Sequence, residues 1–364
     1  MKDLNRQLMI KRSFCILFLV VFCSCNFENN KRTKKNEPIT VEVWYGDVQD
    51  FGKIGLPQKR INILGNAKAK SGIASLSYSL NGKSAIPLTL GSDLHRLAGT
   101  GDFNVDIDRS LLHPGKNSLK FIAKDSSDNH FEKDIRINYI DTEKWPLPYS
   151  IRWKDVKQIQ DVAQVVDGHW EITKSGLHNK DVFYDRIVAI GDDTWQDYEV
   201  STTVTFHSFT PPALGPPTYE ISHAAISSRF PGYDNDSLQP HRKWYPIGAT
   251  SEFRLTANLD SCRWRIYDGP KPDLPQFYAE QPVSEYRSIE LNKRYNMKNR
   301  VETLEGNSTR YSAKLWAFGE EEPQQWDLVG IENDENVHKG SALLVAHNTS
   351  VTFGDVYVSK IVQD

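Results

Sequence analysis

Short runs in which apolar and polar residues alternate fill residues 38–140. In residues 74–82, Leu76, Tyr78 and Leu80 share one face and serines take the other, which is the period of two of a half-buried strand. Similar runs cover residues 39–45, 60–67, 102–107, 117–125 and 133–140. Their spacing, about 8 to 12 residues, predicts a β-sandwich. Residues 44–58 fit the pattern less well, and we expect a packed interdomain loop there, with contact to a ligand as the alternative.

Alternating runs also occur within residues 154–364, where they predict further antiparallel strands. In residues 251–257, for example, Phe253 and Leu255 oppose Glu252 and Arg254. Several strands thus carry one apolar face and one face with charged, histidine or aromatic groups. The outward-facing residues predicted in this way include His223, Arg229, Glu252, Arg254, Arg265, Lys314 and Trp316.

Residues 141–153 join these two regions. Two prolines flank Leu147, so the chain is expected to be extended and stiff. Trp145, Tyr149 and Trp153 are available to pack against both neighbours. The pattern therefore predicts a fixed junction.

Two phrases in the first region, SLSYSLNG at residues 75–82 and L-x-P-G-x-N-x-L-x-F-x-A-x-D at residues 112–125, resemble bacterial immunoglobulin-like or fibronectin-like modules. Such modules are appended to surface enzymes and adhesins. The resemblance covers about 100 residues. It implies an immunoglobulin-like sandwich and says little about function.

The second region resembles concanavalin A-like jelly rolls, the fold of lectins and glucanases. The order W-x-I, G-L, D-R-I and W-x-D-Y-E-V at residues 170–200 is similar to the entry strands of that family, and residues 340–361 are similar to its closing hairpin. The expected fold is therefore all-β, an immunoglobulin-like sandwich followed by a jelly roll. The resemblance also implies that the concave groove of the jelly roll binds sugar.

A long loop at residues 229–249 holds the best local indication of a site, because loops of this length in a compact sandwich tend to be functional. Aromatic rings stack on the apolar faces of sugars, and cationic groups favour acidic glycans. The predicted polysaccharide site comprises His223, Arg229, His241, Arg242, Trp244 and Tyr245, extended by the outward residues named above. The alternative is that these faces are simply solvated.

Catalysis is a further possibility that the sequence leaves open. The E-x-D-x-x-E motif of laminarinase-like jelly rolls is absent, which disfavours a retaining hydrolase of that type. Polysaccharide lyases on the same fold use a tyrosine or histidine base, for which His223, His241 and Tyr245 are the candidates. Hydrolases of keto-sugars are another alternative without a matching motif. A glycan-binding module, a polysaccharide-degrading enzyme and a non-catalytic scaffold or adhesion protein therefore all stay open.

Cofactor motifs are scarce in this sequence. No His/Cys cluster has zinc spacing, and no catalytic triad, P-loop or dinucleotide fingerprint is found. Related jelly rolls place a structural calcium ligand in the last strand, where this chain has Asp355. We therefore expect no cofactor beyond a structural Ca²⁺, with Asp355 as its candidate ligand.

The first 25 residues resemble a bacterial lipoprotein signal. An apolar run at residues 14–22 is too short to span a bilayer and follows four basic residues, Lys2, Arg6, Lys11 and Arg12. Cys25 is the predicted lipid-modified residue, although Phe22 stands where an aliphatic residue is usual. Residues 26–37 are expected to form a disordered tether. This predicts a membrane-anchored envelope protein, with the outer membrane favoured; a plain cleaved signal and an uncleaved anchor are the alternatives.

Composition agrees with an exported all-β protein. Three of the four cysteines lie in the signal, which leaves Cys262 alone and excludes an intrachain disulfide after processing. Removing residues 1–24 takes four basic residues and one acidic residue from totals of 44 and 47, which leaves a net charge of about -6. That acidity argues against nucleic acid as a partner.

Overall fold

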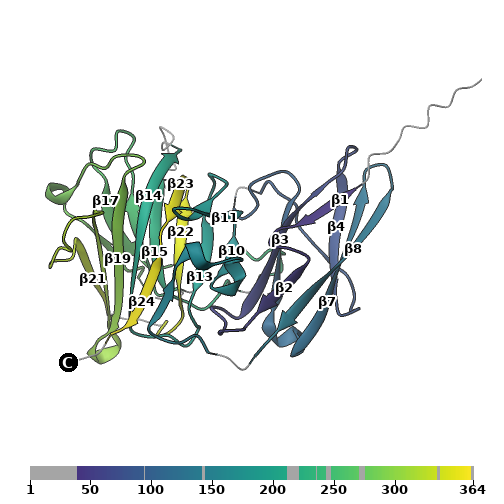
Figure 1. Ribbon diagram of the computed structural model, residues 1–364, viewed down its shortest axis with the longest axis horizontal. Helices are drawn as coiled ribbons and strands as arrows, with labels where there is room; N and C mark the ends of the chain where they lie inside the picture. The colour runs from purple at the N-terminus through teal and green to yellow at the C-terminus, as the bar shows by residue number, and fades with distance from the viewer. Residues whose placement is uncertain are drawn as a thin grey trace, which may run out of the picture. The chain divides into compact units, whose positions relative to one another are not determined.

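The computed structural model describes residues 39–93, 95–141, 144–210, 221–234, 236–242, 247–269, 275–333 and 337–361. The predictions for the signal, for Cys25 and for the tether fall outside these ranges. The regular elements of the described residues are strands and five short 3-10 helices, so the predicted all-β class is confirmed. No helix in these ranges is long and apolar enough to cross a membrane. The strands can be followed in Figure 1.

Two sheets form the N-terminal sandwich. The three-stranded sheet has the order β1 (Thr40–Val43), β3 (Arg60–Lys68) and β6 (Asp102–Asp108). The five-stranded sheet has the order β2 (Val48–Phe51), β8 (His130–Tyr139), β7 (Gly115–Asp125), β4 (Ile73–Leu80) and β5 (Ile86–Pro87). Leu76, Tyr78 and Leu80 are buried in the core between the sheets, as alternation predicts. The likeness to immunoglobulin modules stays a prediction.

The segment at residues 44–58 packs against the second sandwich. The Trp44 ring stacks on His169 at a centroid distance of 4.4 Å, and the Tyr45 hydroxyl donates to the carbonyl of Gly168 at 3.3 Å. The segment is not entirely a loop, however, because β2 lies within it and pairs in parallel with β8. Four residues are too short for alternation to reveal a strand in advance.

The C-terminal sandwich consists of two larger sheets. The seven-stranded sheet has the order β10 (Gln164–Asp167), β13 (Arg186–Ile190), β22 (Ser341–His347), β15 (His223–Phe230), β16 (Ala249–Arg254), β17 (Arg263–Tyr267) and β18 (Tyr278–Glu280). The nine-stranded sheet has the order β11 (Trp170–Thr173), β12 (Gly176–Asn179), β23 (Thr349–Phe353), β14 (Tyr198–Phe209), β19 (Arg294–Thr303), β20 (Thr309–Ala317) and β21 (Leu328–Glu332), with β24 (Val356–Lys360) between β14 and β9 (Tyr149–Ile151). The 3-10 helices span Arg109–Leu111, Trp153–Asp155, Ile159–Asp161, Val283–Glu285 and Glu305–Asn307.

A continuous apolar core lies between these two sheets. It includes Phe206 from the nine-stranded sheet and Phe253 and Trp264 from the seven-stranded sheet, with the last two rings 5.3 Å apart. Packing of two antiparallel sheets face to face is the jelly-roll arrangement that the sequence predicts. From the predicted junction, Trp145 and Trp153 are buried in this same core. The exact domain boundaries stay predictions.

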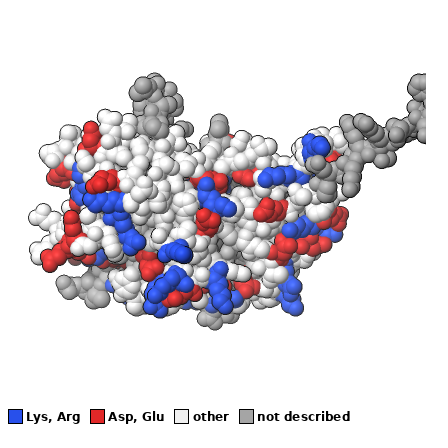
Figure 2. Space-filling view, turned by 45° about the horizontal axis from the view of Figure 1, so that its top comes forward, with Lys and Arg blue, Asp and Glu red and all other residues white. Residues whose placement is uncertain are grey.

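Surface charge is mixed on the face that Figure 2 presents. Lysine and arginine side chains alternate there with aspartate and glutamate side chains, and neither sign forms a continuous field.

Candidate functional site

A row of basic side chains crosses four strands on the outer face of the seven-stranded sheet. In the strand register, His347 of β22 pairs with His223 of β15, His223 with Arg254 of β16, and Arg254 with Arg263 of β17. Their chain neighbours, such as Ala346 and Phe253, face the core. Because side chains alternate across a strand, the four basic residues share the outer face. We call them the histidine–arginine row.

Glu252 lies beside this row and is almost fully buried. Its carboxylate accepts from Arg265 at 2.8 and 3.0 Å and lies 3.4 Å from Nε2 of His223. The distance to Nε of Arg254 is 3.6 Å, which is too long for a hydrogen bond. Glu252 therefore binds Arg265 firmly and leaves Arg254 poorly satisfied.

Arg254 is a buried cation with spare hydrogen-bonding capacity. Only 7% of its side chain is exposed, and its Nε has no hydrogen-bond partner among the described residues. Burial lowers the pKa of Arg254, but a guanidinium stays charged in proteins. A buried donor without an acceptor is unfavourable, so an anion that reached this atom would be stabilised.

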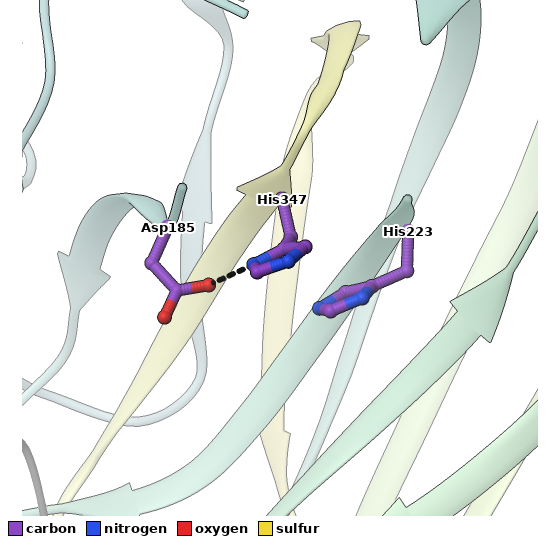
Figure 3. A group of neighbouring side chains, drawn as sticks. All are labelled: Asp185, His223 and His347. Carbon is purple, nitrogen blue, oxygen red and sulfur yellow. Dashed lines mark hydrogen bonds and ion pairs between the residues drawn. The ribbon is translucent and has the colours of Figure 1, made fainter. Parts of the chain in front are cut away.

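Two histidines and an aspartate occupy the start of the row, as Figure 3 shows. The rings of His223 and His347 are parallel within 1° and stack at 4.5 Å. Nδ1 of His347 lies 2.7 Å from the Asp185 carboxylate, and the Asn348 amide lies 3.1 Å from Nε2 of the same ring. The carboxylate accepts from Nδ1 and the amide donates to Nε2, so both partners fix one orientation and tautomer of His347.

His223 has one protonated ring nitrogen and one unprotonated ring nitrogen, and the latter lies 3.4 Å from the Glu252 carboxylate. Its Nδ1 lies 2.9 Å from the carbonyl oxygen of Ile221, which can only accept, so Nδ1 carries the proton. In the neutral ring Nε2 is then a bare acceptor. Burial lowers the pKa of His223 well below 6.5, and the neighbouring His347 lowers it further. The imidazole is therefore neutral at pH 7 and can take up a proton.

The open side of the site is aromatic. The Arg265 guanidinium lies 4.5 Å from the centre of the Tyr267 ring and 5.8 Å from that of Tyr278. Tyr278 belongs to the edge strand β18 and is 54% exposed. An exposed ring beside a cation is a combination that suits sugar stacking together with recognition of an acidic group.

Asp185, His223 and His347 form a group of potential metal ligands. The potential ligand atoms of Asp185, His223 and His347 lie within 4.8 Å of one another. However, the parallel rings direct their lone pairs alongside each other, and both Nδ1 atoms already have partners. Tetrahedral zinc needs converging ligands, so the cluster fits a hydrogen-bonded dyad better than a metal site.

Asp355 lies elsewhere, immediately before β24. It is exposed, and its carboxylate accepts from the backbone N–H of Trp153 at 3.0 Å. The calcium predicted at Asp355 stays a prediction.

Arg229 does not belong to the outer face, which corrects the prediction. Its side chain is fully buried and donates to Thr303 at 2.7 Å and to Thr309 at 2.9 Å. The cause is a register shift in β15 between Ser227 and Phe230, where Arg229 takes a positive φ of 56°. A bulge turns a side chain away from the face that strict alternation assigns to it.

His241 and Arg242 also lie outside the histidine–arginine row. The backbone N–H of His241 donates to Asp106 at 2.7 Å, and the Arg242 guanidinium lies 3.6 Å from Asp93. Both residues thus contact the N-terminal sandwich, and His241 shares no hydrogen-bond partner with His223 among the described residues. The candidates Trp244 and Tyr245 fall outside the described ranges.

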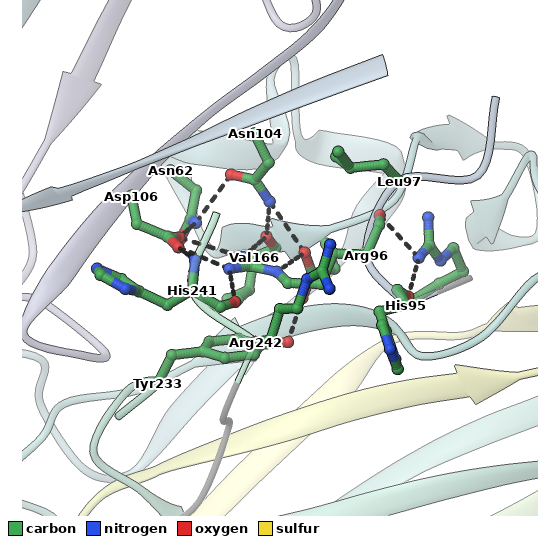
Figure 4. A network of polar contacts seen from close by, with 12 residues as sticks. Asn62, His95, Arg96, Leu97, Asn104, Asp106, Val166, Tyr233, His241 and Arg242 are labelled. Carbon is green, nitrogen blue, oxygen red and sulfur yellow. Dashed lines mark hydrogen bonds and ion pairs between the residues drawn. The ribbon is translucent and has the colours of Figure 1, made fainter. Parts of the chain in front are cut away.

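Figure 4 shows the polar network to which His241 belongs. Arg96 of the N-terminal sandwich pairs with Asp106 and with Asp167 of β10, both at 2.6 Å, and its guanidinium lies 4.0 Å from the Tyr233 ring centre. Tyr233 in turn donates to Asp167. Burial raises the pKa of Asp167 and the neighbouring Arg96 lowers it. The effect of burial is the larger, so the pKa is about 6. This network joins the two sandwiches.

Lys314 and Trp316 lie on β20 of the nine-stranded sheet, so they are not part of the row either. Lys314 is buried and pairs with Glu322 at 2.7 Å. Alternation places both side chains on an outer face, but it does not say which sheet a strand joins.

Of the predicted residues, the structure brings together His223, Glu252, Arg254 and Arg265. Sequence reasoning missed His347 and Asp185. His347 ends a run in which Leu343 and Val345 occupy the same outer face, so alternation could have assigned its direction. Asp185 precedes β13 and carries no comparable signal.

This chain has matches among solved structures at low sequence identity. Models of protein families give no match, and neither do curated proteins. Among solved structures, the exoplasmic/lumenal domain of VIP36 in its Ca²⁺-bound form is 8% identical, with 56% of this chain and 85% of that chain covered and a TM-score of 0.32. The alginate lyase Aly36B is 12% identical, with 49% and 75% covered and a TM-score of 0.31. An endo-β-1,4-glucuronan lyase from the fungus Trichoderma reesei is 8% identical, with 55% and 87% covered and a TM-score of 0.31.

Proposed function

We propose that this protein is an exported bacterial envelope lipoprotein that binds an acidic polysaccharide on the outer face of the seven-stranded sheet. The observation that carries the proposal is the histidine–arginine row with its under-satisfied Arg254. A uronate carboxylate or a sulfate would supply the acceptor that Arg254 lacks. Tyr278 would stack on the neighbouring sugar ring at the open side.

The location in the cell follows from the N-terminal signal rather than from the site. Lipid on Cys25 would tether the protein to a membrane through residues 26–37. The N-terminal sandwich, as an immunoglobulin-like module, would hold the jelly roll away from the bilayer. A polysaccharide of the envelope or its surroundings would then be within reach.

Binding is tested with a panel of neutral, uronic and sulfated polysaccharides. We expect the protein to retain an acidic chain and to ignore neutral ones. Arg254→Gln should weaken that binding about 10- to 100-fold, because a hydrogen bond to a charged group contributes about 1.5–3 kcal/mol. Arg152→Gln is the matched control, since Arg152 is an exposed arginine of the same sandwich that pairs with Asp155. Equal binding by both variants would reject the site.

One observation favours a second candidate function, β-elimination. The neutral His223 ring has an unprotonated Nε2, and Arg254 is its partner on the next strand. Nε2 would take the proton from the carbon next to the uronate carboxylate, whose charge Arg254 would neutralise. The electron pair would form a carbon–carbon double bond, the glycosidic C–O bond would break, and the leaving oxygen would take a proton from water.

Elimination and binding are separable in one assay. New chain ends together with the ultraviolet absorbance of an unsaturated uronate would establish a lyase. In that case His223→Gln should abolish cleavage and keep binding. Retention without cleavage would support the binding module, and the absence of both would favour a scaffold protein.

A further inference from the structure

A polar hollow lies on the outer face of the nine-stranded sheet, away from the histidine–arginine row. Its volume is about 590 Å³, which is within the range of small-ligand sites. Strands β11, β12, β14, β19 and β23 and the turns beside them supply its walls. The lining residues are Thr173, Ser175, His178, Thr205, His207, Asn292, Arg294, Ser350 and Thr352. Every one of them carries a polar side chain.

Register explains why these side chains converge. Arg294 of β19 pairs with Thr205 of β14, Thr205 with Thr352 of β23, and Thr352 with His178 of β12. These residues form one row across four strands. Because the neighbouring Phe353 and Leu177 are buried in the core, the row faces outward.

A bulge adds His207 to the hollow. The pairing of β14 with β23 shifts between Phe206 and Ser208, so His207 is the extra residue. Its Nε2 lies 2.8 Å from the Thr352 hydroxyl and its Nδ1 lies 2.9 Å from the Asn292 side-chain oxygen. Bulges that re-aim a side chain are common next to functional sites. Here the bulge holds an imidazole at a fixed angle beside hydroxyl groups.

His178 keeps one nitrogen available. Its Nδ1 lies 2.8 Å from the carbonyl of Val351, so this nitrogen carries the proton. Within the described residues no partner is found for its Nε2. The hollow thus presents hydroxyls, an imidazole nitrogen and an amide, which are the groups that bind sugar hydroxyls.

The hollow contains the positive charge of Arg294, and no carboxylate in its lining neutralises that charge. Arg294 makes no ion pair within the described ranges; its guanidinium lies 4.6 Å from the Phe318 ring centre. Other cations of the same sheet are neutralised, since Lys298 and Arg300 both pair with Glu199. Among the residues that line the hollow, Arg294 is therefore a cation that could meet an anionic ligand.

We propose that this hollow is a second glycan site, which binds an anionic sugar unit through Arg294, with the hydroxyls and His178 as hydrogen-bond partners. The charged substituent is a sulfate or a carboxylate, both of which a guanidinium recognises. The proposal does not depend on the function proposed for the other sheet, because the two sites share no residue. Two sites on opposite sheets would let one molecule contact two chain segments.

The test measures binding of galactose 6-sulfate and glucuronic acid by saturation-transfer NMR, with galactose as the neutral probe. We expect the charged sugars to bind and galactose to bind weakly. Arg294→Gln should weaken the charged sugars about tenfold or more. Thr205→Val, which removes a hydroxyl from the hollow without removing a charge, should weaken all bound sugars.

Two controls keep the outcome specific. Arg310→Gln removes an arginine from the neighbouring strand outside the hollow and should leave binding unchanged. Arg254→Gln, in the other site, should also leave the Arg294-dependent binding intact. The proposal is overturned if Arg294→Gln binds like the wild type, if Arg254→Gln alone removes all binding, or if inorganic sulfate binds as tightly as the sugars.

Discussion

His223 is a buried histidine whose protonated nitrogen is fixed by the backbone. It is buried to 6% exposure on an outer sheet face, and its proton is fixed on Nδ1 by a backbone carbonyl. Its surroundings include the Glu252 carboxylate, the Arg254 guanidinium and the stacked His347 ring. Together they hold a neutral imidazole in one orientation, which is what either a hydrogen-bond acceptor or a general base requires.

This burial gives His223 a measurable effect on stability. Since the pKa of the folded protein lies well below 6.5, the unfolded chain binds a proton near pH 6 that the folded chain does not. The free energy of unfolding should therefore fall as pH falls below about 6.5, by at most about 1.4 kcal/mol per pH unit from this residue. His223→Gln should remove that component and flatten the profile.

The measurement is a pair of denaturant titrations of wild type and His223→Gln between about pH 7.5 and about pH 5.5. Asp167, whose pKa is raised to about 6, contributes a slope of the opposite sign between its ordinary 3.8 and 6. It is present in both proteins, so the difference between them isolates His223. Parallel profiles would show that His223 is not buried as described.

At this scale, alternation predicted the directions of His223, Glu252, Arg254 and Arg265. Alternation gave the wrong direction for Arg229. The bulge that turns this side chain inward cannot be recognised from the alternation of apolar and polar residues. Alternation also could not find Asp185, whose role depends on which strands become neighbours.

Among the elements, six of the eight described strands of the N-terminal sandwich could be placed from sequence within one to three residues, as β6 and β7 illustrate, whereas β2 and β5 were missed. The groups that pack against β3 could not be predicted from the sequence. The polar residues of β3, such as Asn62, are buried because they face the second sandwich. Asn62 donates to Asp106, and Gln164 of β10 donates to Asn62. Buried polar residues of this kind hydrogen-bond to partners that no local pattern reveals.

The network at this interface predicts a large effect for Arg96. Arg96→Met would leave Asp106 and Asp167 buried without their cation, and should lower the free energy of unfolding by about 3–5 kcal/mol. The measurement is chemical denaturation followed by tryptophan fluorescence.

Arg109→Met provides the matched control. Arg109 also bridges the two sandwiches, through Asp193 at 2.9 Å, but 35% of its side chain is exposed. Removal of this pair should change stability by at most about 1 kcal/mol. Similar small losses for both variants would mean that the buried network does not stabilise the interface.

For the whole molecule, the all-β class and the order of two sandwiches followed from pattern and resemblance. The firmness of their junction rests on Arg96 and Asn104, which both bind Asp167 of the second sandwich, and on the packed Trp44. These residues come from segments far apart in the chain, so their contacts are a property of the assembled fold. Through these contacts the N-terminal sandwich packs directly against the jelly roll.

Membrane attachment is tested on the whole protein. Cys25→Ala should move it from the membrane fraction into the soluble fraction, because a single cysteine carries the predicted lipid. Cys262→Ala is the control, since Cys262 is buried in the jelly roll and should not affect partitioning. Unchanged partitioning of Cys25→Ala would exclude the lipid anchor.

The parallel pairing of β2 with β8 has a mechanical consequence. In a molecule held through its N-terminal side and loaded through a chain bound to the second sandwich, the force would act first on β1, which pairs with β3. Once β1 has separated, the force would act on the start of β2 and the end of β8. Because these strands run in the same direction, such a pull slides one along the other and loads their evenly spaced hydrogen bonds together instead of one by one. The pairing of β2 with β8, which sequence patterning did not reveal, would thus resist the pull after β1 has separated.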